Sequence, residues 1–366
     1  NEKLWKNLFE GTAKDFITEK LKEREHRHEK HGQRYMVEPN VKEGKGGLRD
    51  LQSLYWIAKY VYKTQNISDL IELNVFRSDE HEQFDKAEEF LWAVRCQMHH
   101  LSDRAIEQLS FDLQVEVATA MGYKDSQARR AVEIFMQDYF RHATRVGDLT
   151  RIFLTSLEAV HAKDEPLLER IFKRRPKIGD EYAVIHNRLA IKSEEKFLEK
   201  PINLLKLFSE ALRTGLLIHP NAMRLVSANL SSVDKEFRQS PEAQTIFLEL
   251  LLKHGNPERA LRRMNELGFL AKFIPEFEPI VAMMQFNMYH SYTVDEHTIQ
   301  CLKTLAQIEK GELVEELPIA SSILKDGVNR KVIYIALLLH DIGKGRSDDH
   351  SILGAKIARQ VSPRLG

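Results

Sequence analysis

The sequence predicts a mainly α fold, and three observations support this prediction. Apolar side chains recur at spacings of three and four residues along most of the chain, as they do on the buried face of an amphipathic helix. Residues typical of helix ends flank several of these segments; Pro257 begins and Gly268 ends the stretch 257–268. Only residues 181–191 (EYAVIHNRLAI) alternate well enough to predict a pair of strands. We therefore expect a helical bundle domain followed by a second all-α domain.

Five segments have a clear helical period: 85–109, 127–160, 242–253, 257–268 and 332–341. Gly147 favours a bend in the second of them, and Gly343 and Gly345 are expected to end the last. Residues 309–330 lack this period and predict a loop between two helices.

The same pattern divides the chain into three parts, 1–161, 162–254 and 255–366. Helical periodicity is lost within 162–200, where charged residues are dense and two prolines occur. We expect the middle part to be an irregular or helical connector between two helical domains.

Composition excludes several classes of protein. Lys+Arg and Asp+Glu both number 54 in 366 residues, so a chain-wide basic surface for DNA is not expected. Two cysteines form no disulfide framework, and they favour a reducing compartment such as the cytoplasm. No run of 18 apolar residues predicts a membrane span. The chain has no initiator Met and ends within a helical pattern, so we expect it to be part of a longer protein.

The segment LLLHDIGKG, residues 337–345, ends an apolar run with His340 and Asp341. An imidazole nitrogen beside a carboxylate oxygen suits Mg²⁺, Mn²⁺, Fe or Zn²⁺ better than a thiolate-type structural zinc site. A core histidine that is hydrogen-bonded to an aspartate is the alternative interpretation.

A second candidate ligand lies upstream. The residues from Thr293 to Glu296 have the capping-box pattern, so a helix should begin at Val294 and carry His297 in its first two turns. The core-facing residues of that helix should be Ile299, Leu302 and Leu305.

Downstream of the pair, His350 precedes another helical pattern. Three nearby cations could meet phosphate oxygens: Lys344, Arg346 and Lys356.

This spacing of His297, His340-Asp341 and His350 resembles the HD phosphohydrolase superfamily. In that family, helices supply a His, the His-Asp pair and a later Asp to one or two metal ions. The resemblance implies that these four residues bind a divalent metal, Mg²⁺ or Mn²⁺. The later Asp should follow by several dozen residues, but no acidic residue follows Asp349.

The chemistry of such a site predicts its catalytic residues. A divalent cation lowers the pKa of a bound water and neutralises charge on a phosphoryl group. We expect Asp341, His340 and Lys344 to be catalytic, with Lys344, Arg346 and Lys356 binding phosphate.

A glycine-rich stretch near the N-terminus, VEPNVKEGKGGLRD (37–50), is a further motif. Pro39-Asn40 predicts a turn, GKGG a tight loop, and Leu48 the start of a helix. Glycines before a helix can expose amide N–H groups to an anion, although a structural turn is equally compatible. Gly-Lys is not followed by Ser or Thr, so this is not a Walker loop.

This motif, the stretch 256–300 and the segment around His340-Asp341 also resemble the bifunctional family that uridylylates and deuridylylates the PII nitrogen-signalling protein. In that family a nucleotidyltransferase domain transfers UMP from UTP to a tyrosine of PII. The HD domain hydrolyses the product to release UMP, and glutamine, sensed by ACT domains, selects between the two activities.

The resemblance implies that 1–161 is the helical domain that follows the transferase core, and that 255–366 is a truncated HD domain. The transferase Gly-Ser turn with its Asp-x-Asp pair is not found, and the ACT domains are missing too. Lys45 and Arg49 are expected on the nucleotide side.

Two alternatives stay open: an HD hydrolase acting on nucleotides or RNA ends, and a degenerate HD domain that serves as a regulatory scaffold. The histidines of EREHRHEKHGQR (22–34) are expected on a solvated helix face rather than at a metal.

Overall fold

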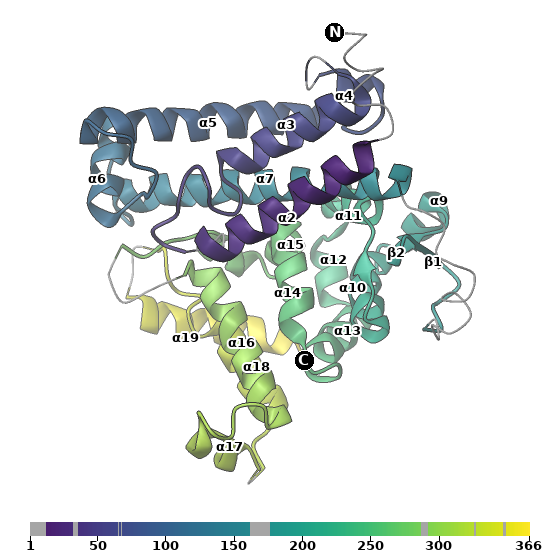
Figure 1. Ribbon diagram of the computed structural model, residues 1–366. Coiled ribbons are helices and arrows are strands. Elements are labelled where there is room, and N and C mark those ends of the chain that lie inside the picture. The colour runs from purple at the N-terminus through teal and green to yellow at the C-terminus, as the bar shows by residue number, and fades with distance from the viewer. Residues whose placement is uncertain are drawn as a thin grey trace. The chain divides into compact units, whose positions relative to one another are not determined.

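The computed structural model describes residues 12–31, 36–64, 66, 68–161, 176–286, 292–325, 327–346 and 349–366. It is mainly helical, as predicted (Figure 1). The chain forms two compact units, the first from Asn1–Asp164 with Met284–Tyr292, and the second from Glu165–Met283 with Thr293–Gly366. Among the described residues, no helix combines the length and the apolarity needed to cross a bilayer.

The regular elements described in the first unit are helices. Its helices are α2 (Ala13–His31), α3 (Leu48–Tyr62), α4 (Asp69–Glu72), α5 (Ser78–Ser102), α6 (Phe111–Ala120) and α7 (Ala131–His161). Two long amphipathic helices, α5 and α7, lie side by side and bury Leu91, Phe135 and Phe140 (Figure 1).

The predicted helix over 85–109 exists, but it begins and ends seven residues earlier. It begins at Ser78 because the backbone N–H of Arg77 donates to the carboxylate of Glu80 at 2.9 Å, which satisfies a free end of the helix. It ends where Asp103 adopts a left-handed φ of 51°.

The second unit combines a small sheet with helices. Its strands are β1 (Tyr182–Ile185), β2 (Arg188–Ile191) and β3 (Leu217–Ile218), in the order β1-β2-β3. Antiparallel pairing of β1 with β2 confirms the strand pair predicted over 181–191. A two-residue turn with positive φ at His186 and Asn187 joins them, as tight hairpins require.

The remaining elements of this unit are helical. The α-helices before residue 287 are α9 (Glu194–Leu198), α10 (Asn203–Thr214), α11 (Pro220–Ala228), α12 (Lys235–Gln239), α13 (Pro241–Leu252), α14 (Pro257–Glu266) and α15 (Phe269–Phe273). Those after it are α16 (Val294–Lys310), α17 (Pro318–Lys325), α18 (Arg330–Leu339) and α19 (His350–Val361). Short 3₁₀ helices are η2 (Leu230–Ser232), η3 (Pro275–Ile280) and η4 (Ser362–Arg364).

Two expectations about local structure are wrong. Helix α16 begins at Val294 as predicted, but the expected capping box does not form. The Thr293 side chain makes no cap hydrogen bond, and the Glu296 carboxylate binds Arg262. The loop expected over 309–330 contains α17, which begins at Pro318 because the fixed φ of proline suits a first helical residue. The helix was not predicted because eight residues are too few to show a clear period.

One hydrophobic core runs through the second unit. It joins side chains from the expected connector, such as Phe208, with others from the expected HD part, such as Phe269, Leu302 and Leu338. Residues 182–254 therefore belong to the same packed body as the helices that carry the His-Asp pair.

Candidate metal centre

Two packed helices position the candidate ligands. His297 lies in the first two turns of α16, and its backbone N–H donates to Thr293 O at 2.8 Å. Helix α18 buries Tyr334, Leu338 and Leu339 and ends with His340 at its C-cap. Asp341 follows in the turn, and α16 contacts α18.

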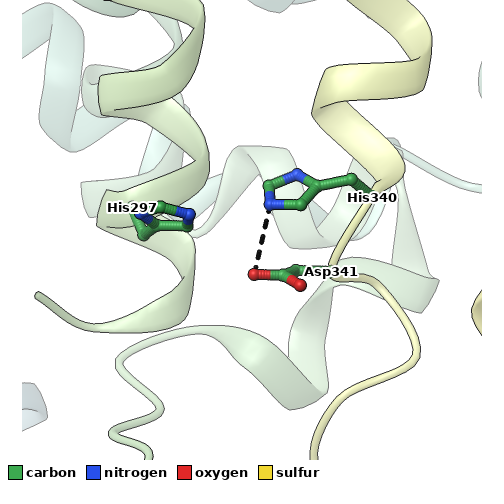
Figure 2. Close-up of side chains that lie close together, drawn as sticks. All are labelled: His297, His340 and Asp341. Carbon is green, nitrogen blue, oxygen red and sulfur yellow. Dashed lines mark ion pairs between the residues drawn. The ribbon is translucent and has the colours of Figure 1, made fainter. Parts of the chain in front are cut away.

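The three side chains converge. One potential ligand atom from each of His297, His340 and Asp341 lies within 4.8 Å of the other two, and Figure 2 shows them facing a common point. The two imidazole rings meet edge to face with centroids 5.5 Å apart. His340 Nε2 lies 3.2 Å from Asp341 Oδ2. Residues predicted from two separate stretches, around His297 and around His340-Asp341, therefore meet where one metal ion could bind both.

The tautomer of His340 follows from its neighbours. Its Nδ1 lies 2.7 Å from Leu337 O, and a carbonyl oxygen can only accept, so Nδ1 carries a proton. Nε2 faces Asp341: when it is protonated it donates to Asp341 Oδ2 at 3.2 Å, and when it loses that proton its lone pair becomes available to a metal. This is the usual orientation of a metal-binding histidine, whose second nitrogen donates to a fixed acceptor.

Electrostatics favour an ionised carboxylate in this group. The hydrogen bond with Asp341, against the opposing effect of burial, raises the pKa of His340 above 6.5. Burial alone would raise the pKa of Asp341, but hydrogen bonds from His340 and Lys344 outweigh it and hold that pKa well below its usual range. The buried Lys344 donates to Asp341 Oδ2 at 2.8 Å. Asp341 is therefore an anion wherever the protein is folded near neutral pH.

A thiol that was not singled out from the sequence lies beside the group. Cys301 Sγ is 3.6 Å from His297 Nε2, one helical turn further along α16. Burial and the negative charge of Asp341 both raise the pKa of Cys301, so the thiol stays protonated. Its spacing of four residues from His297 was the available sequence signal.

Glycine shapes the turn after the His-Asp pair. A Cβ on Gly343 would lie well under 3.0 Å from His350 O and 2.7 Å from Gly354 N, so only glycine lets this turn pack against the start of α19. Gly345 has a φ of +77°, which also favours glycine. Arg346 donates from its two terminal nitrogens to Ile342 O at 3.2 Å and to Glu276 O at 3.1 Å.

His350 and Lys356 lie on α19, and both are exposed. His350 is not a member of the three-residue group that the described part of the chain contains. Asp349 is the N-cap of α19, and its side chain accepts hydrogen bonds from Ser351 N and Ile352 N. The predicted roles of His350 as a ligand and of Lys356 as a phosphate contact stay predictions.

The glycine-rich loop of the first unit uses its amides internally. The N–H groups of Gly44, Gly47 and Leu48 donate to carbonyls within residues 40–47 at 2.9–3.0 Å, and Gly46 N donates to Asp50 Oδ2. This bonding favours the structural turn over an amide cradle for an anion. Within this loop, Lys45 is exposed.

Arg49 donates to Gln52 and Glu43 and lies 5.5 Å from the Trp56 ring centroid. The predicted place of Lys45 and Arg49 beside a nucleotide stays a prediction.

The histidines of α2 were expected on a solvated face, and for His28 this expectation is wrong. Asp50 is fully buried and accepts from Arg24 at 3.3 Å, Arg27 at 2.5 Å and His28 at 2.9 Å, all on α2. His26 is exposed, as expected. The buried carboxylate was missed because a single aspartate in the first turn of α3 has no periodic signal.

Residues 294–366, which carry His297 and the His340-Asp341 pair, match the HD domain family. Residues 15–154 match "GlnD PII-uridylyltransferase", and residues 182–273 match "Uridylyltransferase GlnD third domain". The chain belongs to the family of bifunctional uridylyltransferase/uridylyl-removing enzymes, which confirms the resemblance seen in the sequence.

Curated relatives carry that name in several bacteria. The chain is 67% identical over 366 residues to the bifunctional uridylyltransferase/uridylyl-removing enzyme of Ruegeria pomeroyi. It is 62% identical over 367 residues to that of Cereibacter sphaeroides and 47% identical over 376 residues to that of Bradyrhizobium diazoefficiens. Each match covers 100% of this chain and 40% of the relative's length. No solved structure matches the chain.

Proposed function

We propose that this chain carries the uridylyl-removing site of a bifunctional enzyme of nitrogen regulation. In this proposal the site hydrolyses the phosphodiester between UMP and a tyrosine of PII and releases UMP. The observation that carries the proposal is the convergence of His297, His340 and Asp341 within 4.8 Å, inside the region that matches the HD domain. In this proposal the transferase activity and the response to glutamine are properties of a longer protein, comparable in length with the relatives.

The donor set fits a divalent metal. Two imidazole nitrogens and one ionised carboxylate oxygen suit Mn²⁺ well, and Mg²⁺ as an oxygen-preferring alternative. Held by His297, His340 and Asp341, such an ion would supply Lewis-acid polarisation of the phosphodiester and a lower pKa for a nearby water.

The side chains of this chain set up the reaction. Leu337 O orients the His340 ring, and Lys344 keeps Asp341 ionised. The Lys344 ammonium lies 2.8 Å from Asp341 Oδ2, so it would hold a non-bridging oxygen of the phosphodiester. In the balanced reaction, water oxygen bonds to phosphorus, the bond from phosphorus to the tyrosyl oxygen breaks, and the tyrosine recovers a proton. Arg346 and Lys356 are proposed to add positive charge on the phosphate side.

Substitution of the pair in the full-length protein tests this function. His340→Ala or Asp341→Ala should abolish release of UMP from uridylylated PII and leave transfer of UMP to PII largely intact. His254→Ala, in the same unit but outside the group, is the matched control and should change neither activity. Equal loss of both activities in the His340 and Asp341 variants would mean that the pair is structural. Hydrolysis of free nucleotides as fast as uridylylated PII would favour the nucleotide hydrolase instead.

A further inference from the structure

One short segment touches both elements that carry the candidate ligands. Two hydrogen bonds join residues 275–283, which comprise η3 and the residues after it, to the start of α16. Val294 N donates to Met283 O at 2.8 Å, and Ala282 N donates to Asp295 Oδ2 at 2.9 Å. These bonds place the first turn of α16, and with it His297, on this segment.

The turn that carries His340 and Asp341 rests on the same segment. Arg346, at the end of that turn, donates to Glu276 O at 3.1 Å. The backbone of Gly345 approaches so closely that an added Cβ would lie 3.0 Å from Met283 Sδ and 3.4 Å from Pro279 O. Residues 275–283 therefore act as a common support for the two halves of the metal group.

Asp295 is the side chain that fastens α16 to this support. It is 1% exposed, and its Oδ2 accepts both from Ala282 N and from Asn265 Nδ2 at 2.7 Å. One carboxylate thus ties the helix start to 275–283 and to α14. Ala282 has a φ of 56°, an unfavourable conformation for a residue with a side chain, and its bond to Asp295 stabilises it.

The neighbouring side chains Thr293 and Glu296 have different surroundings. Thr293 makes no cap hydrogen bond. Glu296 is bound by Arg262 at 2.8 Å, which joins α16 to α14 but not to residues 275–283.

We propose that Asp295 is a positioning residue of the metal centre, which holds the first turn of α16 on residues 275–283 so that His297 faces His340 and Asp341. The proposal rests on the proposed function in one respect, the binding of a divalent cation. Bonds from a metal to nitrogen or oxygen are about 2 Å long, so a small displacement of His297 removes it from the coordination sphere. A side chain that fixes this turn therefore controls affinity without touching the ion.

Mn²⁺ binding to the 366-residue chain, followed by the electron paramagnetic resonance signal of the free ion, is the first test. Asp295→Ala should weaken Mn²⁺ binding about 10- to 100-fold, the range found for residues that orient metal ligands. Asp295→Asn keeps an acceptor oxygen for both donors and should retain most of the affinity. Asp234→Ala removes a helix-capping carboxylate from α12, which accepts from Phe237 N at 2.9 Å, and should leave Mn²⁺ binding unchanged.

A second measurement needs no metal. The rings of His297 and His340 lie 5.5 Å apart, so each shifts the carbon-bound proton resonances of the other in NMR spectra. Asp295→Ala should remove these ring-current shifts, whereas Asp295→Asn should preserve them. If Asp295→Ala does not fold, Asn265→Ala is used instead, because it deletes one of the two donors to Asp295. It should reduce the ring-current shifts in the same direction, but by less.

The two failures are distinguishable. A folded Asp295→Ala variant with wild-type Mn²⁺ affinity and unchanged histidine shifts would overturn the positioning role and leave the proposed function standing. A wild-type chain that binds no Mn²⁺ would remove the metal from the proposed function, while the histidine shifts would still decide whether Asp295 positions the ring. Unchanged shifts in folded Asn265→Ala, when Asp295→Ala cannot be studied, would also overturn the proposal.

Discussion

At the scale of single residues, the aspartates Asp341 and Asp50 have opposite surroundings. Asp341 keeps part of its surface open beside His340 and Lys344, where its ionised oxygens can bind a cation. Asp50 has no exposed surface and is enclosed by two arginines and a histidine. The first arrangement suits binding, and the second suits only the joining of α2 to the glycine-rich loop.

Asp50→Asn should destabilise the first unit by about 3 kcal/mol at pH 7, because it removes the nearer of the two carboxylates that neutralise the buried Arg27 and leaves only Glu43, at 3.8 Å. Urea unfolding followed by tryptophan fluorescence measures this change. Asp79→Asn, which breaks the exposed pair with Arg77, is the control and should cost about 0.5 kcal/mol or less. A similar cost for both variants would contradict the role given to Asp50.

The stability that Asp50 contributes should depend on pH in a defined direction. Burial by itself would raise the pKa of Asp50, but His28, Arg24 and Gly46 N lower it below its ordinary 3.8. A lowered folded pKa means that the stabilisation is complete above pH 3.8 and is lost as pH falls through the folded pKa. The difference between wild type and Asp50→Asn should therefore be constant near neutral pH and shrink only below 3.8.

Burial also lowers the pKa of His28 below 6.5, so its neutral form is the stable one in the fold. The unfolded chain takes up this proton first as pH falls, and stability should decrease from pH 6.5 downward. A His28→Gln variant should lose this part of the pH dependence, and an unchanged profile would show that His28 does not contribute.

At the scale of elements, two glycines face each other where the His-Asp turn meets α19. A Cβ on Gly343 would strike backbone atoms of His350 and Gly354, whereas a Cβ on Gly354 would meet Gly343 N at an ordinary 3.5 Å. The two positions face each other, but only one of them tolerates a side chain.

Gly343→Ala should therefore destabilise the second unit by about 1–3 kcal/mol, because backbone atoms cannot move aside without displacing α19. Gly354→Ala lies inside a helix and should be neutral or stabilising by up to about 1 kcal/mol. Thermal unfolding followed by circular dichroism compares the pair. Equal effects of the two substitutions would show that the turn does not pack on α19 as described.

At the scale of the whole molecule, the chain contains two units, and all three candidate ligands belong to the second. All three tryptophans of the sequence, at positions 5, 56 and 92, fall within Asn1–Asp164 of the first unit. Fluorescence therefore reports on one unit, while circular dichroism reports on both.

Mn²⁺ at about 100 times its dissociation constant should stabilise the second unit by about 2.7 kcal/mol, since binding to the folded state alone shifts unfolding by mass action. The transition seen by circular dichroism should move to higher temperature, while that seen by tryptophan fluorescence should stay in place. His340→Ala should abolish the shift. A shift of the fluorescence transition alone would place the metal in the first unit.

Much of this organisation is predictable from the sequence because its causes are local. Helical content follows from apolar spacing, and the start of α16 at Val294 follows from its flanking residues. Local signals misled where a side chain had a better distant partner: Glu296 leaves the expected capping box because Arg262 on α14 offers an ion pair. Helix α17 was missed because eight residues define no period.

By itself, the sequence determined the helical class, the strand pair and the family, and it identified His297, His340 and Asp341 as candidate ligands, since residue types and their order carry that information. Only the tertiary structure decided that these three side chains meet, that His350 is outside their group and that Asp50 is a buried node. Such proximity depends on how distant helices pack in a shared core, and spacing along the chain does not encode distances in space.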